Sequence, residues 1–543
     1  MRDEEKDRRV RPGRQRLALG ALSGVLAGFA ALAVAELAAA AVRPQSGPVI
    51  AVGGASIDAT PAPVKDWAIR HFGTDDKLVL QLGIVAVLAV LALALGVLAL
   101  RSRRGGAAGM LLFGLVGALA AVGRPDSIGG ADALPSAVGA VAGALLLYVL
   151  VGRLSAVRRS SAPVAGSVTE EAGDALGAGK GWDRRGFVLA AGSAAAASAA
   201  VGAAGRSLNA SRGQDAIASR EKVVLPAAGS PARPVPKRAV SRAPGASPFF
   251  TPNDDFYRVD TALVVPRVDA TAWRLRVHGM GVRRPATYSF DDLLHRELIE
   301  RDITLTCVSN EVGGPYVGNA RWTGVRLADL LAECGVEPPS RGGPADQMVS
   351  RSVEGMTIGS PVEDVMDGRD GMLALGMNGE PLPFAHGFPV RMVVPGLYGF
   401  VSACKWIEDI ELTTFDSYDP YWVKRGWARR APVKTESRID TPKPFARPRA
   451  GTVMVAGVAW APHRGIGEVE VRIDDGPWQE AHLAAEDTRD TWRQWSLPWQ
   501  ATPGGHTLTV RATDRTGAAQ TGERTRTIPD GASGWHTVVV TVE

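Results

Sequence analysis

A chain of 543 residues is too long for one hydrophobic core, so several domains are expected. The net charge of +5 is modest, and much of the excess arginine lies beside apolar stretches, which indicates membrane topology and argues against a nucleic-acid partner. The three cysteines form no CxxC pair, which argues against a zinc site, and their odd number leaves at least one thiol without a disulfide partner.

Four apolar runs in the N-terminal part are long enough, or nearly so, to cross a hydrocarbon core of roughly 30 Å. They are Leu17–Val42, Leu78–Leu100, Ala107–Val122 and Ala133–Val151. Arginine clusters precede the first run and follow the second and fourth: Arg8, Arg9, Arg11, Arg14 and Arg16, then Arg101, Arg103 and Arg104, then Arg153, Arg158 and Arg159. If every run crosses, all three clusters lie on one side, which the positive-inside rule assigns to the cytoplasm.

A pair of arginines within Trp182–Val188 is followed by an Ala/Gly/Ser run to about Gly205. This pattern resembles a twin-arginine export signal, here internal to the chain. An ordinary fifth span with positive flanks is the alternative. Either interpretation places everything after residue 206 on the outer side of the membrane.

The predicted spans contain no histidine, the usual ligand of a haem buried in a helical bundle, and His71 lies in the outer loop. Glu36 is the one carboxylate predicted at membrane depth, and intramembrane acids are candidates for function. The spans therefore read as an anchor. A membrane transporter that depends on Glu36 is one rival interpretation.

Residues 206–246 are rich in Pro, Ala, Ser, Arg and Lys without apolar periodicity, which predicts a tether. Alternation in Trp273–Gly279 predicts a strand, and Ser289 followed by Phe290–Leu294 predicts a capped helix start. The apolar strand Ile303–Val308 carries Cys307, and the small residues of the following loop would let a ligand approach the backbone closely.

Cys307 has two interpretations, a buried core residue or a thiolate ligand for a soft or high-valent metal. The segment from Asn378 to Phe400 favours the second. It contains a turn at Asn378-Gly379, then His386 and Arg391 around a Gly/Pro-stiffened start of an apolar strand, and Lys405 follows beyond the next turn. Arginine and lysine that converge on one loop suit recognition of a phosphate.

The string from Asn378 through Arg391 to Trp406 closely resembles the sulfite oxidase family of molybdenum enzymes, over roughly residues 245–543. The resemblance implies a molybdenum–molybdopterin cofactor, with Cys307 as the protein thiolate on the metal. It also implies that the remaining cofactor contacts come from Asn253, Phe256, Tyr257, Thr357, His386, Arg391, Ser402 and Lys405. No disulfide is expected at Cys404, because the resemblance places it in the cofactor-binding turn.

After Arg438, short alternating strands separated by turns indicate an immunoglobulin-like sandwich, and the family resemblance implies a dimerisation domain. The expected fold is thus four to five transmembrane α-helices, an α+β sulfite-oxidase-type molybdopterin domain and a C-terminal immunoglobulin-like β-sandwich. The expected boundaries are 1–160 for the membrane domain, 161–206 for the cytoplasmic loop with the signal or fifth helix, 207–245 for a flexible linker, 246–437 for the catalytic domain and 438–543 for the sandwich.

The chain departs from the family where sulfite oxidases place arginines that bind the substrate dianion. Pro252 stands at one such position, and Asn310, Glu311 and Val312 follow the ligand cysteine; the tyrosine expected near Thr357 is also absent. Fewer fixed positive charges weaken the binding of a dianion. A compensating role is one hypothesis for three arginines further on, Arg425, Arg429 and Arg430.

The sequence therefore predicts two-electron oxygen-atom transfer on a small sulfur-containing substrate, with sulfite oxidation first and reduction of sulfoxides of the methionine sulfoxide type as the alternative. No cytochrome b5-like segment is present, so a separate redox partner, a cytochrome or a quinone-linked protein, is expected. A non-enzymatic binding module on a membrane stalk is the remaining rival. This rival predicts that no molybdenum is bound and that a Cys307→Ser change alters neither the colour nor the activity of the protein.

Overall fold

The computed structural model describes residues 14–61, 64, 67, 71–72, 76–124, 127, 129–155 and 184–543. The chain forms two compact units. The helical unit comprises Met1–Arg212 with Thr261–Leu263, and the β-rich unit comprises Gly213–Asp260 with Val264–Glu543. Residues that entered the topology and export predictions but lie outside the described part of the chain are Arg8, Arg9, Arg11, Arg158, Arg159, Trp182 and Asp183.

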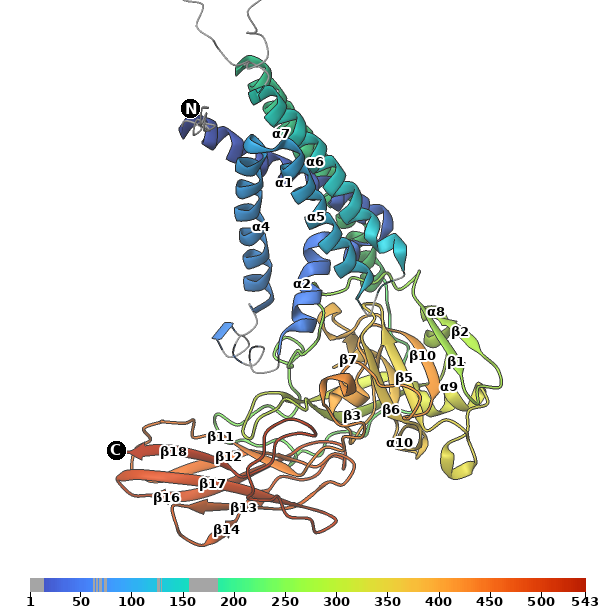
Figure 1. Ribbon diagram of the computed structural model, residues 1–543. Coiled ribbons are helices and arrows are strands. Elements are labelled where there is room, and N and C mark those ends of the chain that lie inside the picture. The colour runs from blue at the N-terminus through green and yellow to red at the C-terminus, as the bar shows by residue number, and fades with distance from the viewer. Residues whose placement is uncertain are drawn as a thin grey trace, which may run out of the picture. The chain divides into compact units, whose positions relative to one another are not determined.

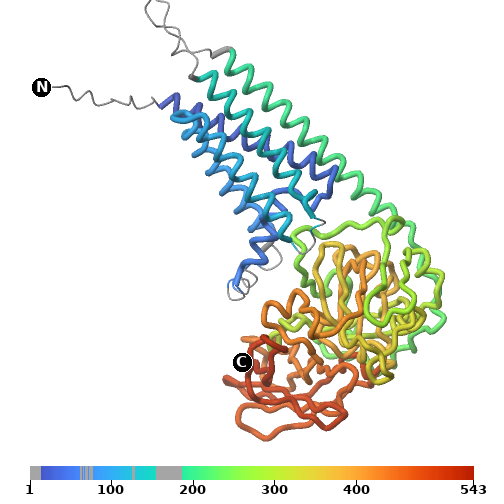
Figure 2. The backbone as a smooth tube through the Cα atoms, turned by 45° about the vertical axis from the view of Figure 1, so that its right-hand side comes forward, coloured from blue at the N-terminus to red at the C-terminus, as the bar shows by residue number. Residues whose placement is uncertain are grey.

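The helical unit contains long apolar helices that run side by side (Figures 1 and 2). They are α1 (Arg14–Val42), α4 (Asp76–Arg101), α5 (Arg103–Val122), α6 (Leu134–Ser155) and the first part of α7 (Arg184–Glu221), with the shorter α2 (Pro48–Ala59) after α1. Five of the described helices are long and apolar enough to cross a membrane. The hydrocarbon core offers no hydrogen-bond partners, and a helix satisfies its backbone N–H and C=O groups internally. The four predicted spans are confirmed as helices, and the five membrane-length helices indicate a membrane protein.

Helix α7 corrects the prediction of an irregular tether from residue 206, because it continues to Glu221. Residues 207–221 contain no proline and several good helix formers, so the absence of an apolar stripe does not end the helix. The chain after α7 belongs to the β-rich unit and is hydrogen-bonded to other parts of it. Ser230 donates its backbone N–H to Leu298 O at 3.2 Å, and Arg238 O accepts the N–H of Ala485 at 2.9 Å.

The first half of the β-rich unit has an α+β fold, as predicted. One sheet has the strand order β2 (Ala286–Ser289), β1 (Arg274–Gly279), β10 (Ile407–Thr413), β5 (Gln347–Ser352), β6 (Thr357–Pro361), in which only β1 and β10 are parallel. The other has the order β3 (Leu298–Thr306), β4 (Val317–Arg326), β7 (Met372–Met377), β8 (Glu380–Pro381), with β9 (Arg391–Val393) also paired to β7. Short helices connect these strands: α8 (Phe290–Leu294), α9 (Leu327–Glu333), α10 (Val362–Met366) and α11 (Gly399–Ser402). The predicted cap of α8 is present, since Ser289 and Asp292 form a reciprocal capping box.

The second half of the β-rich unit is a sandwich of two antiparallel four-stranded sheets, as predicted. One sheet has the order β11 (Glu436–Thr441), β12 (Gly451–Trp460), β16 (Arg493–Ala501), β15 (His482–Leu483). The other has the order β14 (Trp478–Glu480), β13 (Ile466–Ile473), β17 (Gly504–Asp514), β18 (His536–Val542). Alternating side chains of the two sheets fill the space between them, including the fully buried Val455, Val471 and Val510.

Glu436, at the start of β11, makes the stability of the protein depend on pH. Its carboxyl is buried and Oε1 has no hydrogen-bond partner within the described structure. Burial raises its pKa from 4.5 to about 8, against the opposing charge of Lys434. The folded state therefore holds this proton more tightly than the unfolded state, so stability is lost as pH rises from 4.5 to 8, by about 1.4 kcal/mol for each pH unit of that window.

Glu436→Gln is expected to remove this loss of stability at high pH, because the amide does not ionise. The variant should unfold at a higher temperature than the parent chain at pH 8, and the two should converge near pH 4.5, measured by thermal unfolding in detergent across that range. A difference in unfolding temperature that does not change with pH would contradict the assignment.

Candidate functional site

Cys307 follows the last residue of β3 and lies in a buried turn. Its backbone N–H donates to Tyr316 O at 2.9 Å, its carbonyl accepts from Asn310 N at 3.0 Å, and its Sγ accepts from Ser309 N at 3.4 Å. The side chain is 8% exposed. Burial raises the pKa of the thiol, which the hydrogen bonds from Ser309 and the charge of Lys405 oppose. The β3–β4 hairpin thus fixes the backbone of Cys307 through both its N–H and its carbonyl, and Cys307 lines a cavity of the β-rich unit.

His386 ends a short 3-10 turn, Phe384–His386, and lies near Arg391 on β9. Arg391 donates from Nη1 to His386 O at 3.3 Å, and the Nε2–H of His386 donates to Asn253 O at 2.8 Å. Burial and then the charge of Arg391 lower the pKa of His386 to about 4, so the ring is neutral at pH 7. Because Nε2 carries the proton, Nδ1 can accept a hydrogen bond from a donor group of a ligand.

Lys405 follows α11 and brings a second cation to the same place. Its Nζ lies 2.6 Å from Asp260 Oδ2, and both side chains are nearly inaccessible. Burial lowers the pKa of Lys405, while Asp260 opposes that shift. Arg258 Nε also lies 3.7 Å from the same Asp260 oxygen.

These groups share one cavity in the β-rich unit. Its walls are Phe256, Tyr257, Val259, Asp260, Cys307, Val308, Ser309, Met356, His386, Arg391, Gly399, Phe400, Ala403, Lys405, Trp422 and Trp427. A thiol, a neutral imidazole and two buried cations therefore meet at one cavity. The rest of the wall is formed by Asp260, Ser309 and mostly apolar or aromatic side chains, which include Phe400, Trp422 and Trp427.

Residues 262–422 match the family described as the oxidoreductase molybdopterin binding domain. Human mitochondrial sulfite oxidase is 30% identical over 305 residues, which are 48% of this chain and 55% of that protein. An uncharacterized oxidoreductase of Bacillus subtilis is 33% identical over 162 residues, 30% of this chain and 75% of that protein.

The chain belongs to the sulfite oxidase family. Its residues 262–422 form a molybdopterin-binding oxidoreductase domain, which implies a molybdenum–molybdopterin cofactor. The chain spans about half the length of the sulfite oxidases that it matches. Among solved structures, the sulfane dehydrogenase SoxCD of Paracoccus pantotrophus aligns with a TM-score of 0.47 and 23% identity, over 57% of this chain and 90% of that one.

The cavity of this sulfite oxidase family member fits an anionic cofactor. Arg391 is buried, has no carboxylate partner in the described structure, and leaves its Nε without a hydrogen-bond partner. Its guanidinium stands over the Trp322 ring at 5.0 Å, and burial lowers its pKa to about 10. A buried cation without a counter-charge is costly unless a ligand supplies one. The phosphate of molybdopterin is such a ligand, and a soft thiolate suits the metal.

Six of the nine predicted site residues line the cavity: Phe256, Tyr257, Cys307, His386, Arg391 and Lys405. Asn253 lies behind the wall, where its carbonyl holds His386 and its side chain is bonded to Asn378 and Glu380. Two predicted hydroxyls are used inside the protein. Thr357 Oγ1 accepts from the backbone of Tyr421, and Ser402 Oγ donates to Leu397 O.

The three arginines proposed to compensate for the missing charge do not line the cavity. Arg429 pairs with Asp419 at 2.9 Å, Arg430 lies over the Phe415 ring, and Arg425 lies over the Tyr421 ring. The structure therefore does not support that hypothesis. All three cysteines are free thiols, so Cys404 forms no disulfide, as the resemblance implied.

Sequence reasoning missed several residues of the wall: Asp260, Met356, Phe400, Trp422 and Trp427. Asp260 lies three positions after Tyr257, so the same segment carries both, but a single acidic residue has no pattern that marks it. Trp422 and Trp427 flank the basic run that was singled out for its charge. Here the tryptophans, and not the arginines, reach the cavity.

Proposed function

We propose that this chain catalyses two-electron oxygen-atom transfer on a small sulfur-containing substrate, with sulfite oxidation as its reaction. The observation that supports it is the meeting of the Cys307 thiol with two buried cations, Arg391 and Lys405, in one cavity. Bound molybdenum supplies the oxygen-atom transfer and takes up the two electrons.

The roles of the residues follow from their chemistry. Cys307 would hold the metal as a thiolate, and Arg391 and Lys405 would neutralise the cofactor phosphate. His386 would present Nδ1 as an acceptor for a donor group of the pterin, because Asn253 fixes Nε2 as the protonated nitrogen. Phe256 and Tyr257 stack at 5.2 Å between ring centroids and would exclude water on one side.

Sulfite is the first substrate because several relatives are named sulfite oxidases. The wall of Met356, Phe400, Trp422 and Trp427 favours a second candidate, an organic sulfoxide, whose apolar groups would pack there. Asp260 also favours it, since one carboxylate beside Lys405 reduces the positive potential that a dianion needs.

Asp260→Asn is expected to lower the KM for sulfite by about 3- to 10-fold in the loaded enzyme, with a smaller change in kcat. The reason is that the change removes one negative charge from the cavity wall beside Lys405, which raises the positive potential that a dianion meets. The effect should diminish at high ionic strength, and Asp416→Asn, an exposed carboxylate that does not line the cavity, should change neither constant. An unchanged KM would show that Asp260 does not act on the substrate.

The location and partners are part of the proposal. We propose that the helical unit lies in the cell membrane and that the β-rich unit lies on the extracytoplasmic side, which the arginine clusters around the spans support. A cytochrome or a quinone-linked redox partner would receive the electrons, and the sandwich would form the interface of a homodimer. The boundaries proposed from the sequence, 246–437 for the catalytic domain and 438–543 for the sandwich, divide the β-rich unit near the start of β11.

The test uses the full chain, purified in detergent, loaded with cofactor and oxidised. Sulfite added without oxygen should raise the paramagnetic signal of molybdenum, and Cys307→Ser should abolish it. If sulfite is silent while methionine sulfoxide reoxidises the chemically reduced enzyme, the second candidate is correct. If neither substrate changes the metal, both candidates are wrong.

A further inference from the structure

A second cavity lies between helices of the helical unit, opens to the surface of that unit and is almost entirely apolar. It has a volume of about 320 Å³. Its lining comes from α1, α2, α4, α5 and α6: Val25, Gly28, Phe29, Ala31, Leu32, Ala35, Pro48, Val52, Val85, Leu88, Ala89, Leu91, Ala92, Leu95, Met110, Phe113, Gly114, Gly117, Ser136, Gly139 and Ala140. Its volume lies at the lower end of the range of small-molecule sites, about 300–1,000 Å³.

The helix crossing explains why this space exists. Helices α1 and α4 touch backbone to backbone at Gly24 and Gly96, since a Cβ on Gly24 would collide with Ala92 O and one on Gly96 with Gly20 O. Beyond this contact the lining runs along α1 towards Ala35 and along α4 towards Val85. Helix α4 also contacts α5 and α2, since a Cβ on Gly109 would collide with Leu95 and one on Gly53 would meet Ile84. The cavity therefore begins beside the close crossing of α1 and α4 and is bounded by side chains of all these helices.

Ser136 brings one polar group to this apolar lining. The residue is 3% exposed, and its hydroxyl has no hydrogen-bond partner among the described residues. It lies against Gly117 of α5, which also lines the cavity. A buried hydroxyl without a partner costs free energy, and a ligand that carries a hydrogen-bond acceptor would remove that cost.

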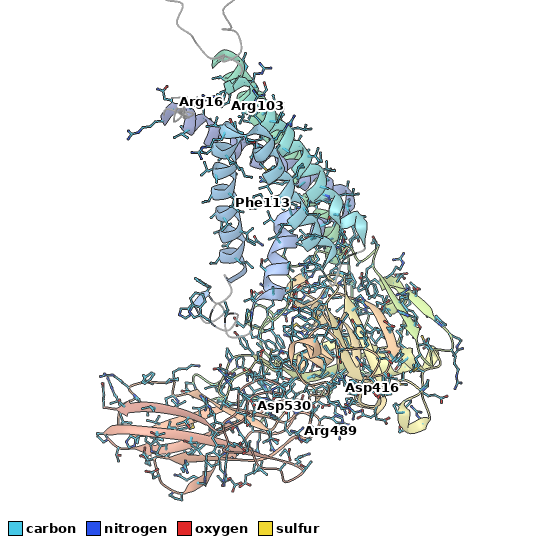
Figure 3. All side chains as sticks on the ribbon, in the orientation of Figure 1. Arg16, Arg103, Phe113, Asp416, Arg489 and Asp530 are labelled. Atoms are coloured by element: carbon cyan, nitrogen blue, oxygen red, sulfur yellow. The ribbon has the colours of Figure 1, made fainter. Side chains whose placement is uncertain are left out.

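The lining also suits a flat ring. Phe29, Met110 and Phe113 supply aromatic and polarisable contacts to the lining. Phe113, labelled in Figure 3, lies on α5 and lines the cavity. A ring with a carbonyl oxygen would satisfy the Ser136 hydroxyl while its apolar faces and tail fill the remaining space.

We infer that this cavity binds the ring of a membrane quinone, with a ring carbonyl accepting from Ser136. The inference rests on the proposed function for its redox part. Oxidation of sulfite releases two electrons and two protons, and a quinone takes up two of each: sulfite, water and quinone give sulfate and quinol. The five long helices carry no histidine to bind a b-type haem, which leaves the quinone as the acceptor of matching stoichiometry in this unit.

The experiment measures binding directly. The full chain is purified in detergent, and quinone and phospholipid per protein are quantified by mass spectrometry, before and after incubation with menaquinone. Ala89→Phe fills the cavity from α4, whereas Ala86→Phe places the same ring on an exposed position of α4 outside the lining. Ser136→Ala removes only the hydroxyl.

About one quinone per chain is expected for the parent and for Ala86→Phe, with a loss of at least about fivefold in Ala89→Phe and about fivefold in Ser136→Ala. Equal quinone in Ala89→Phe and Ala86→Phe, phospholipid in its place, or no quinone at all would each overturn the inference. Cys307→Ser should still bind quinone, so failure of the proposed function is separable. If quinone binds but sulfite does not reduce it, the proposed reaction fails and the site stands.

Discussion

Cys307→Ser is expected to lower the turnover of the loaded enzyme by at least about 1,000-fold, because the serine hydroxyl is a hard ligand that is protonated at neutral pH where the metal needs a soft thiolate. The sulfur lies at the end of β3 among the cationic side chains of the cavity, so no neighbouring cysteine can replace it. Cys334 and Cys404 are buried but absent from the cavity lining. Steady-state oxidation of sulfite, with molybdenum content measured on the same samples, checks this prediction.

The matched control is Cys334→Ser, which removes a buried thiol that contacts the Tyr288 hydroxyl at 3.4 Å and does not line the cavity. It should retain turnover within a few-fold. If both serine variants lose activity equally, the loss reflects the packing of a buried thiol. If Cys307→Ser keeps full activity with molybdenum bound, the thiolate assignment is wrong.

The sequence predicted the helical unit well, because membrane spans are the case in which local composition decides structure. A run such as Leu78–Leu100 has no alternative to a helix in hydrocarbon, and the structure has α4 there. Where composition is ambiguous the prediction failed. Residues 207–221 lack apolar periodicity, yet α7 continues through them because nothing in the segment stops a helix.

At the site, the sequence indicated the residues of one long motif together with Phe256, Tyr257 and Cys307, and missed Asp260, which meets Lys405 only through the fold. His386, Arg391 and Lys405 lie within twenty residues, whereas the Lys405–Asp260 pair joins positions 145 apart in sequence. No local pattern reveals such a pair. The hydroxyl of Ser402 faces the carbonyls of Leu397 and Tyr398 in its own turn, and its role at the cofactor stays a prediction.

The same logic explains why the basic run after Trp422 misled the sequence interpretation. Arginines indicate charge wherever they occur, but their long side chains can reach either solvent or a site. In the structure Arg429 reaches Asp416 and Asp419, and Trp422 and Trp427 turn inward. The direction of a side chain in an irregular segment depends on the backbone, which composition alone does not supply.

Arg391→Met is expected to have opposite effects on the cofactor-free and cofactor-loaded protein. Methionine keeps most of the apolar volume against Trp322 and removes a charge that burial already disfavours, as the lowered pKa of about 10 shows. The cofactor-free chain should therefore gain stability, by about 2 kcal/mol, in thermal or denaturant unfolding. Cofactor affinity should fall by on the order of 100-fold, since a buried charge-assisted contact to phosphate is lost.

This pair of effects separates a ligand-binding arginine from a structural one. Arg369 is the matched comparison, because it is also buried but pairs with Asp364 at 2.8 Å and Asp367 at 2.7 Å. Arg369→Met should destabilise the cofactor-free chain, because it leaves two carboxylates without their partner. If Arg391→Met behaves in the same way, Arg391 contributes to the core of the domain and not to the cofactor. A gain in stability together with loss of molybdenum would show that the cavity keeps an unpaired charge for the anion it binds.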